Sequence, residues 1–415
     1  MVKKIDILSI KLKKAHLYPT ILFAYIFLTY ATNYFSLPEI YLQCSLYIFL
    51  IFSFFRLLLN KANIPIVFSS WYLGFILICL VSLFYASSLE LSMNIGSSLI
   101  MAFLFGISMS VFLQTENGSE KLMTIFIITG VFVGTFLALT FNPEHSWSRL
   151  GEDFGVNENL VGLMYLIPLC FAFVNVYNKK LITLSSLAII VCGYDVLISG
   201  SKKAIFGFLV FALVYLLSEN KVSKKIRNTI LVILMAISIF IIIMKIPSLY
   251  NVAGYRFELM YHSLIGDGGN AISSTTTRMS MIQYGLRLIV ESPIWGYGIN
   301  NFAHYWSIVS GKQTYSHNNY VELLFDLGLL GFFTYYSVHF YIGTKLLGIR
   351  KMYPTTGAIY IAFFILILFY DFGMVTYYDT RIITLIAFVL YGTGREASKK
   401  RGELTHEEII NFEGL

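Results

Sequence analysis

The chain has 415 residues, of which 57% are hydrophobic, 17% aromatic and only 13% charged, and its mean hydropathy is +0.71. This composition excludes an ordinary soluble globular protein and predicts an all-α polytopic integral membrane protein. The net charge of +7 is attributed to basic loops on the cytoplasmic side, so it requires no nucleic-acid partner.

The first apolar run follows a basic N-terminus that contains five lysines within its first 14 residues and lacks a small-residue cleavage site. We therefore expect a retained signal anchor and a cytoplasmic N-terminus. Because about 20 apolar residues span a bilayer, further runs of this kind predict about twelve transmembrane helices. Their centres lie near residues 27, 50, 75, 103, 131, 168, 190, 210, 237, 331, 365 and 386.

Alternation of sides from that start places most of the 30 Lys and Arg residues in the cytoplasm, in agreement with the positive-inside rule. Both termini are then cytoplasmic, and residues 394–415 form a charged tail. No internal repeat is apparent, so residues 1–415 are expected to form a single transmembrane domain. The four cysteines all lie within apolar runs and have neither metal-ligand nor disulfide spacing.

Two connections on the outer side of the membrane stand out. Residues 141–159 join the fifth and sixth predicted spans, and residues 246–317 form a much longer extracytoplasmic loop. Loops of that length are usually functional. Within the long loop, the segment 275–292 has helical periodicity. It predicts an amphipathic helix whose apolar face consists of Met279, Ile282, Leu286, Ile289 and Val290.

Acidic residues of the predicted spans gather near the outer membrane face: Asp195, Glu322, Asp326 and Asp371. Charges inside a bilayer are costly and often mark function. For Asp326, hydrogen bonds to loop backbone are a simpler explanation than catalysis, because loop ends leave many backbone groups to satisfy. Asp195 and Asp371 are interpreted as counter-ions of the outer lysines or of Arg381.

Basic residues on the outer side are exceptions to the positive-inside rule: Arg149, Lys202, Lys203, Arg278 and Arg287. Arg278 would lie in the first turn of its helix, where the helix dipole disfavours a cation. An anion bound by both the helix start and the guanidinium would remove that conflict, so the pattern predicts a phosphate site. The alternative for Lys203 is that its side chain only extends to the membrane interface.

Several common catalytic patterns are absent from the sequence, namely a D-x-D pair, a G-x-x-x-x-G-K phosphate loop and an H-E-x-x-H pair. The stretch GYGINN at residues 296–301 lacks the third glycine of a dinucleotide fingerprint. An enzyme with this sequence is therefore expected to use neither cofactor nor metal. His317 opens the tenth predicted span, although a lone loop histidine is as often an ordinary surface residue as a catalyst.

Three separated stretches resemble the O-antigen polymerase and ligase superfamily of bacterial membrane glycosyltransferases, the Wzy-type polysaccharide polymerases among them. Arg149, followed by Gly151 and Asn159, resembles a fourth and weaker element. The resemblance covers most of residues 140–390. The three stretches are SGSKKA at residues 199–204, R-x17-G-Y-G-x3-F from Arg278 to Phe302, and H-N-x-Y-x-E-x3-D-x-G-x-x-G from His317 to Gly331.

The resemblance implies transfer of a glycan from undecaprenyl pyrophosphate at the outer face of the cytoplasmic (inner) membrane. By motif match it implies His317 as the base, and the cations Arg149, Lys202 and Arg278 as ligands of the pyrophosphate. The adjacent Lys203 is a further candidate ligand of the pyrophosphate. Lys202 stands where relatives often have arginine, so a point charge replaces a bidentate fork. Supporting roles are expected for three further residues of the third stretch: Asn318, Tyr320 and Asp326.

Direct displacement by a sugar hydroxyl would invert the anomeric centre, and this route is favoured. A retaining route would need a carboxylate nucleophile, for which Glu322 is the candidate. The preferred function is a polymerase that adds the growing chain to the next lipid-linked repeat unit, possible partners being a chain-length regulator and a flippase of the same pathway. The alternatives are a ligase that transfers the glycan to a lipid A core, a membrane transporter or flippase, and a non-catalytic scaffold.

Overall fold

The computed structural model describes residues 2–32, 34–141, 149–151, 156–218, 222–265, 274–350 and 354–401, and within these ranges it contains helices and turns but no strand. The predicted loop 141–159 and tail 394–415 therefore lie partly outside the described residues. The first helices are α1 Val2–Ala31, α2 Glu39–Leu58, α3 Ile66–Ser82, α4 Leu89–Asn94, α5 Gly96–Leu113, α6 Gly118–Thr140, α7 Glu158–Tyr177, α8 Ile182–Ile198 and α9 Lys202–Leu217.

The remaining helices include those of the long predicted loop. They are α10 Val222–Lys245, α11 Pro247–Leu249, a π-helical turn at Tyr250–Gly254, α12 Tyr255–Ile265, α13 Ser274–Ile289, α14 Phe302–Ser310, α15 Asn319–Arg350, α16 Pro354–Asp371 and α17 Thr380–Arg401.

A helix lies at every predicted span centre, and six segments of the described chain are long and apolar enough to cross a membrane. These are α2, α4 with α5, α6, α7, α10 and α15. Four further apolar segments are shorter, in α1, α3, α8 and α16. The all-helical membrane fold is thus confirmed, and the number of about twelve spans stays a prediction.

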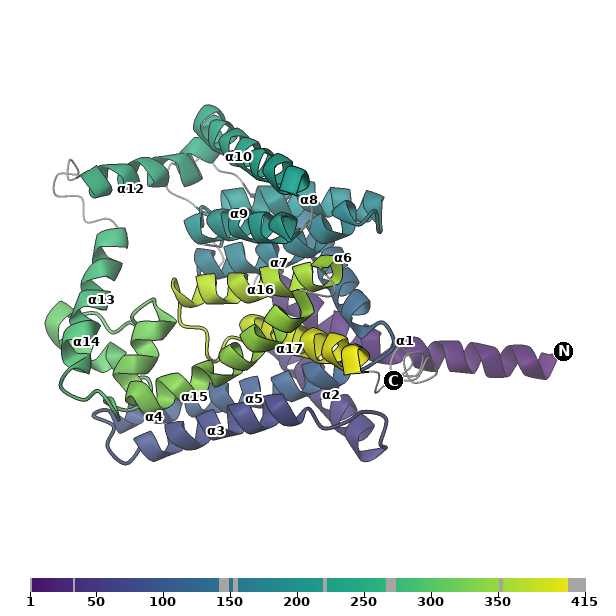
Figure 1. Cartoon of the computed structure of the whole chain (residues 1–415), viewed down its shortest axis with the longest axis horizontal. Coiled ribbons are helices and arrows are strands. Elements are labelled where there is room, and N and C mark those ends of the chain that lie inside the picture. Colours follow the sequence, from purple (N-terminus) through teal and green to yellow (C-terminus); the bar gives the residue numbers. More distant parts are fainter. Residues whose placement is uncertain are drawn as a thin grey trace.

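The centre and the rim of the bundle differ in burial although both are apolar. In α7, 78% of the most apolar stretch is buried, whereas in α10 only 17% is buried. Figure 1 shows α10 at one edge of the bundle, with its neighbours on one side only. A helix that is apolar on all sides and exposed in this way is stable only in lipid.

The long helices run side by side, and α12, α13 and α14 lie beyond one end of them (Figure 1). We call this the loop end and the opposite end, toward which α17 runs, the tail end. The starts of α7, α9, α15 and α17 lie at the loop end, together with the turns that follow α8 and α16.

The structure has a helix, α13, where the sequence predicts an amphipathic one, but a different face packs. Met279, Leu286 and Val290 are 53%, 49% and 77% exposed. The buried stripe contains Met281 and Gly285 instead, and Met281 packs in a small cluster with two phenylalanines of α14 and α15. Three of the five residues of the predicted apolar face are therefore exposed, and a second stripe packs against α14 and α15. The sequence carries both stripes, and only the position of α14 and α15 selects between them.

Candidate functional site

The tenth predicted span is broken near its start, and a loop segment fills the break. Within α15, Gly328 has φ 60° and ψ −162°, which no helix contains. The Leu329 N–H donates to the Pro293 carbonyl over 2.8 Å, and the Gly298 N–H donates to the Asp326 carbonyl over 2.8 Å. A Cβ at Gly328 would lie 2.3 Å from the Ile294 backbone, so only glycine fits there. These contacts join the glycine-containing segment at residues 296–302 to the glycine-containing start of α15.

The Asp326 carboxylate is held entirely by backbone of the GYGINNF segment. Its Oδ2 accepts from the Asn300 N–H over 2.7 Å, and its Oδ1 accepts from the N–H groups of Asn301 and Phe302 at 3.0 Å each. The carboxylate thus sits at the start of α14, where the helix dipole favours a negative charge. The prediction that Asp326 bonds to loop backbone is confirmed.

His317 lies in a short loop that is fixed from both sides. Its backbone has φ 58°, an uncommon conformation for a residue other than glycine. The next residue, Asn318, caps α15, since its Oδ1 accepts from the Val321 N–H over 3.0 Å. The Asn318 amide also donates to the Phe372 carbonyl over 3.2 Å. Asn318 therefore holds the loop in place against the turn that follows α16.

Tyr320 supports the same joint from the first turn of α15. Its hydroxyl donates to the Leu368 carbonyl of α16 over 3.1 Å, and its ring stacks on Tyr336 with centroids 5.0 Å apart. The start of α15, and with it His317, is therefore anchored on α16.

Glu322 lies beneath the His317 loop and is buried. Its Oε2 accepts from the Ser316 N–H over 2.7 Å, while its Oε1 has no hydrogen-bond partner among the described residues. One oxygen of this carboxylate, Oε2, therefore orients the loop. The other oxygen, Oε1, has no partner among the described residues, whereas both oxygens of Asp326 on the same helix accept hydrogen bonds.

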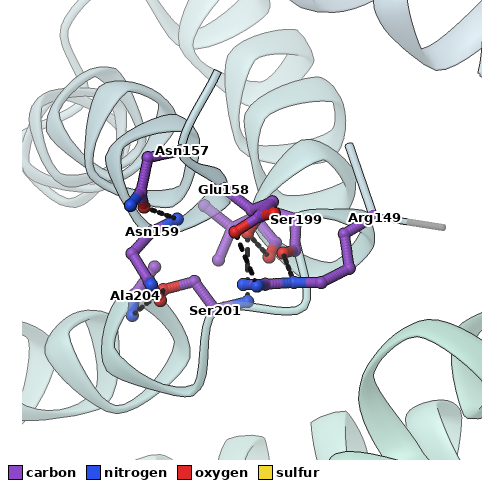
Figure 2. A network of polar contacts seen from close by, with 8 residues as sticks. Arg149, Asn157, Glu158, Asn159, Ser199, Ser201 and Ala204 are labelled. Atoms are coloured by element: carbon purple, nitrogen blue, oxygen red, sulfur yellow. Dashed lines mark hydrogen bonds and ion pairs between the residues drawn. The ribbon is translucent and has the colours of Figure 1, made fainter. Parts of the chain in front are cut away.

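Arg149 braces the turn between α8 and α9, as Figure 2 shows. Its Nε donates to the Ser199 carbonyl over 2.9 Å, and its Nη1 forms an ion pair with Glu158 at 2.7 Å. From the same turn, the Ser201 hydroxyl donates to Asn159 over 3.3 Å. The weak fourth stretch and the SGSKKA stretch are thus bonded to each other.

Lys202 and Lys203 are the first residues of α9, with Ser201 as the N-cap. Two cations at a helix start are disfavoured by the helix dipole. In the part of the chain that the structure describes, neither lysine has a carboxylate within ion-pair distance. The Lys203 side chain passes over the turn after α16, and a Cβ on Gly373 would lie 2.8 Å from its methylene carbons.

Arg278 brings the long loop to these lysines. It is half-buried, and both burial and the nearby charge of Arg256 lower its pKa. Lys202 experiences the charges of Arg256, Arg278 and Arg149. Arg278 also acts on Lys203 and on His317, so its charge is close to both lysines and to the imidazole. The helix begins at Ser274, so Arg278 follows the first turn rather than lying in it, and the predicted dipole contribution at this residue is correspondingly weaker.

The His317 imidazole shares this electrostatic environment. Its pKa is lowered to about 3 by burial first and then by the charges of Arg278 and Lys203. The ring packs against Tyr315 with centroids 4.3 Å apart, and no hydrogen bond to either ring nitrogen is found among the described residues. At neutral pH the imidazole of the free protein is therefore uncharged.

The structure thus gathers five predicted residues from four separate segments into one region at the loop end: Arg149, Lys202, Lys203, Arg278 and His317. Asn318, Tyr320 and Glu322 lie beside them and fix the loop, whereas Asp326 is committed to the GYGINNF segment. The described chain contains no group of three or more His, Cys, Asp and Glu side chains that could hold a metal ion.

Sequence reasoning missed Arg256 and misjudged two acidic residues. Arg256 is in α12, and the sequence offered only its position in the long loop as a signal. The counter-ion of Arg381 is Asp379 at 2.6 Å, not Asp195 or Asp371. Asp371 accepts hydrogen bonds from Tyr336 and Thr376, so that interpretation is wrong. The reason is proximity: Asp379 lies two residues from Arg381 in the turn before α17.

A comparison with known families supplies an independent observation. Residues 187–336 match the model of a family described as O-antigen ligase. The matched region begins in α8 and ends in α15, so it contains the two lysines, Arg278 and His317. None of the curated proteins matches the chain.

Proposed function

We propose that this chain, in which residues 187–336 match the O-antigen ligase family model, is a polysaccharide-assembly enzyme of the O-antigen polymerase and ligase superfamily. More specifically, we propose that it is a polysaccharide polymerase. In this proposal it transfers a growing glycan from undecaprenyl pyrophosphate to the next lipid-linked repeat unit. The reaction takes place at the loop end, on the outer face of the cytoplasmic membrane. A chain-length regulator and a flippase are proposed partners.

The observation that carries the proposal is the group of cations around a neutral histidine. Lys202, Lys203 and Arg278 converge without a carboxylate partner among the described residues, although unpaired charges near a membrane are costly. A pyrophosphate would supply the missing negative charge. Because Lys202 lies at the N-terminus of α9, the helix dipole would attract the same anion.

The cations favour the transition state over the bound substrate. As the bond between the sugar C1 and the phosphate breaks, negative charge grows on the departing pyrophosphate. Arg278 and the lysines are already placed to stabilise it, so little reorganisation is needed during the reaction. Arg149 contributes by holding the turn from which Lys202 begins.

His317 would take the proton of the attacking sugar hydroxyl. In the free protein its pKa is about 3 because burial and two cations disfavour the protonated ring. A bound pyrophosphate neutralises those cations, so the pKa rises and the imidazole becomes a stronger base when the donor is in place. Donor binding thereby prepares the base.

We propose direct displacement with inversion at C1. The acceptor hydroxyl would attack C1 on the face opposite to the departing pyrophosphate, and the bond from C1 to the phosphate oxygen would break. The hydroxyl proton would pass to a ring nitrogen of His317. Glu322 is not needed as a nucleophile in this route. Its bond to the Ser316 N–H supports a positioning role, in which it fixes the loop that carries the base.

Polymerase activity can be separated from ligase activity by the acceptor. The purified full-length protein in lipid vesicles, given lipid-linked repeat units alone, is expected to produce a ladder of chain lengths. Transfer that occurs only after a separate core acceptor is added would establish the ligase alternative instead.

His317→Ala tests the catalytic assignment. The ladder is expected to disappear while the protein remains inserted and folded. The matched control is His304→Ala, because His304 is a histidine of the long loop that lies in α14. Unchanged polymer length and yield in His317→Ala would contradict the proposal and favour a scaffold.

A further inference from the structure

A cavity of about 830 Å³ opens at the tail end, far from His317. The helix α7 joins the two regions, since Glu158 at its start bonds Arg149 and Asn175 near its end lines the cavity. Its 20 residues correspond to roughly 30 Å. The polar side of the cavity is formed by Ser119, Glu120, Asn175, Asn178, Lys180 and Arg395.

Two helix N-termini meet at this cavity. The helix α6 begins after Asn117 and α8 begins after Leu181, and neither start has a side-chain cap. Ser119 in the first turn of α6 and Leu181 at the start of α8 both line the cavity. The backbone N–H groups of an uncapped first turn form an anion site, and here two such turns lie together.

The charged side chains add to this positive character. Lys180 forms an ion pair with Glu120 at 2.6 Å, and both side chains are 59% exposed. Arg395 of α17 is a second cation in the lining. The lining therefore carries two cations and one carboxylate, beside two positive helix ends.

Asn175 indicates that the cavity is built for a ligand. The residue is only 6% exposed and lines the cavity, yet among the described residues its side-chain amide has no hydrogen-bond partner. Its neighbour Asn178 is satisfied, because it donates to the Tyr215 hydroxyl over 3.0 Å. Because it borders the cavity, this amide is available to form a hydrogen bond with a bound group.

We propose that this cavity binds the phosphate of an anionic phospholipid headgroup from the leaflet at the tail end. The deeper lining consists of Met123, Val174, Ile359 and Phe388, which suit an acyl chain better than a soluble anion. Basic pockets between transmembrane helices on the cytoplasmic side bind such headgroups, and the sequence predicts that the tail end is cytoplasmic. The bound lipid would join α6, α8 and α17. The inference does not depend on the reaction proposed for the loop end.

The test uses the full-length protein in nanodiscs of phosphatidylcholine with increasing phosphatidylglycerol. The measurement is the phosphatidylglycerol fraction that produces half of the rise in unfolding temperature. Lys180→Gln and Arg395→Gln are each expected to raise that fraction roughly fivefold. Asn175→Asp, which adds a negative charge without changing size, is expected to act in the same direction.

Glu120→Gln is the decisive variant because its effect has the opposite sign. It removes the only carboxylate of the lining described here and releases Lys180, so less phosphatidylglycerol should be needed. A site in which the ion pair only stabilises the fold would show a loss instead. The matched control is Lys179→Gln, an exposed lysine of the same turn outside the lining, which should leave the half-effect fraction unchanged.

Two results would overturn the inference. Equal responses of the wild-type protein, Arg395→Gln and Glu120→Gln would show that phosphatidylglycerol acts through general surface charge. Full stabilisation by inorganic phosphate in phosphatidylcholine nanodiscs would show that a soluble anion, not a lipid, is the ligand.

Discussion

Two polar regions at the loop end, one around Asp326 and one around Arg278, differ in how their charges are satisfied. Around Asp326, three backbone N–H groups surround the carboxylate and the GYGINNF segment closes over it. Around Arg278 and the two lysines, the positive charges face one another, with no carboxylate partner among the described residues.

This difference separates charges that stabilise the fold from charges that bind a ligand. A buried charge with a full set of partners stabilises one local structure, and its removal leaves orphaned groups. Like charges held close together lower the stability of the free protein and persist where a ligand compensates them. On this reasoning we propose that Asp326 stabilises the fold and that the cations bind the substrate.

The largest effect is expected for Arg278→Gln. Arg278 acts on both Lys202 and Lys203, so its loss should lower kcat/KM by about 10²–10³, as loss of a preplaced transition-state donor does. Steady-state turnover of lipid-linked repeat units measures this. The matched control is Arg287→Gln on the exposed side of the same helix, for which we expect no significant change. Equal loss in both variants would remove Arg278 from the site.

Asp326→Ala should act on stability instead. It leaves three buried N–H groups without an acceptor, which should cost about 3 kcal/mol or more in the free energy of unfolding. The exposed acid Glu90 provides a control, since Glu90→Ala should change stability by less than about 0.5 kcal/mol. Chemical denaturation in detergent gives both values. A stable but inactive Asp326→Ala protein would place this carboxylate in the reaction and end the contrast drawn above.

The sequence predicts the membrane fold well because long apolar runs are an unambiguous signal. It also predicts the backbone role of Asp326, since a carboxylate beside a loop has many N–H groups to accept from. The clustering of Lys202, Lys203, Arg278 and His317 was expected only from the shared membrane side and the resemblance. The positions of α9, α13 and α15 relative to one another cannot be predicted from the periodicity of the sequence.

Other features could not be obtained from sequence. Arg256 carries no spacing that sets it apart from other loop arginines. The packing face of α13 depends on which of two apolar stripes meets α14 and α15. The prediction paired Arg381 with distant buried acids, whereas its ion-pair partner is the nearby Asp379.

A smaller effect separates the cations from the base. Lys203→Gln removes one of the charges that lower the His317 pKa, so this pKa should rise from about 3 toward its ordinary value. A higher pKa means that the base is protonated at less acidic pH, and the acid limb of the kcat/KM profile should shift upward by about one pH unit. In the wild-type protein the acid limb of kcat should lie above that of kcat/KM, because bound pyrophosphate screens the cations. Identical limbs would separate His317 from the pyrophosphate site.

The smallest effect is expected for Glu322→Gln, which tests whether the unsatisfied carboxylate oxygen belongs to the fold or to the reaction. A glutamine oxygen can still accept from the Ser316 N–H, so the His317 loop should keep its position. If the carboxylate only positions the loop, kcat should fall by less than about tenfold, whereas the loss of a covalent nucleophile costs many orders of magnitude. The shape of the kcat/KM pH profile should stay the same, since His317 remains the base. Complete loss of turnover, together with a glycosyl group trapped on Glu322 in the wild-type protein, would establish a retaining reaction. In that case the unsatisfied oxygen would mark the nucleophile, just as we propose that the cations without a carboxylate partner among the described residues mark a phosphate site.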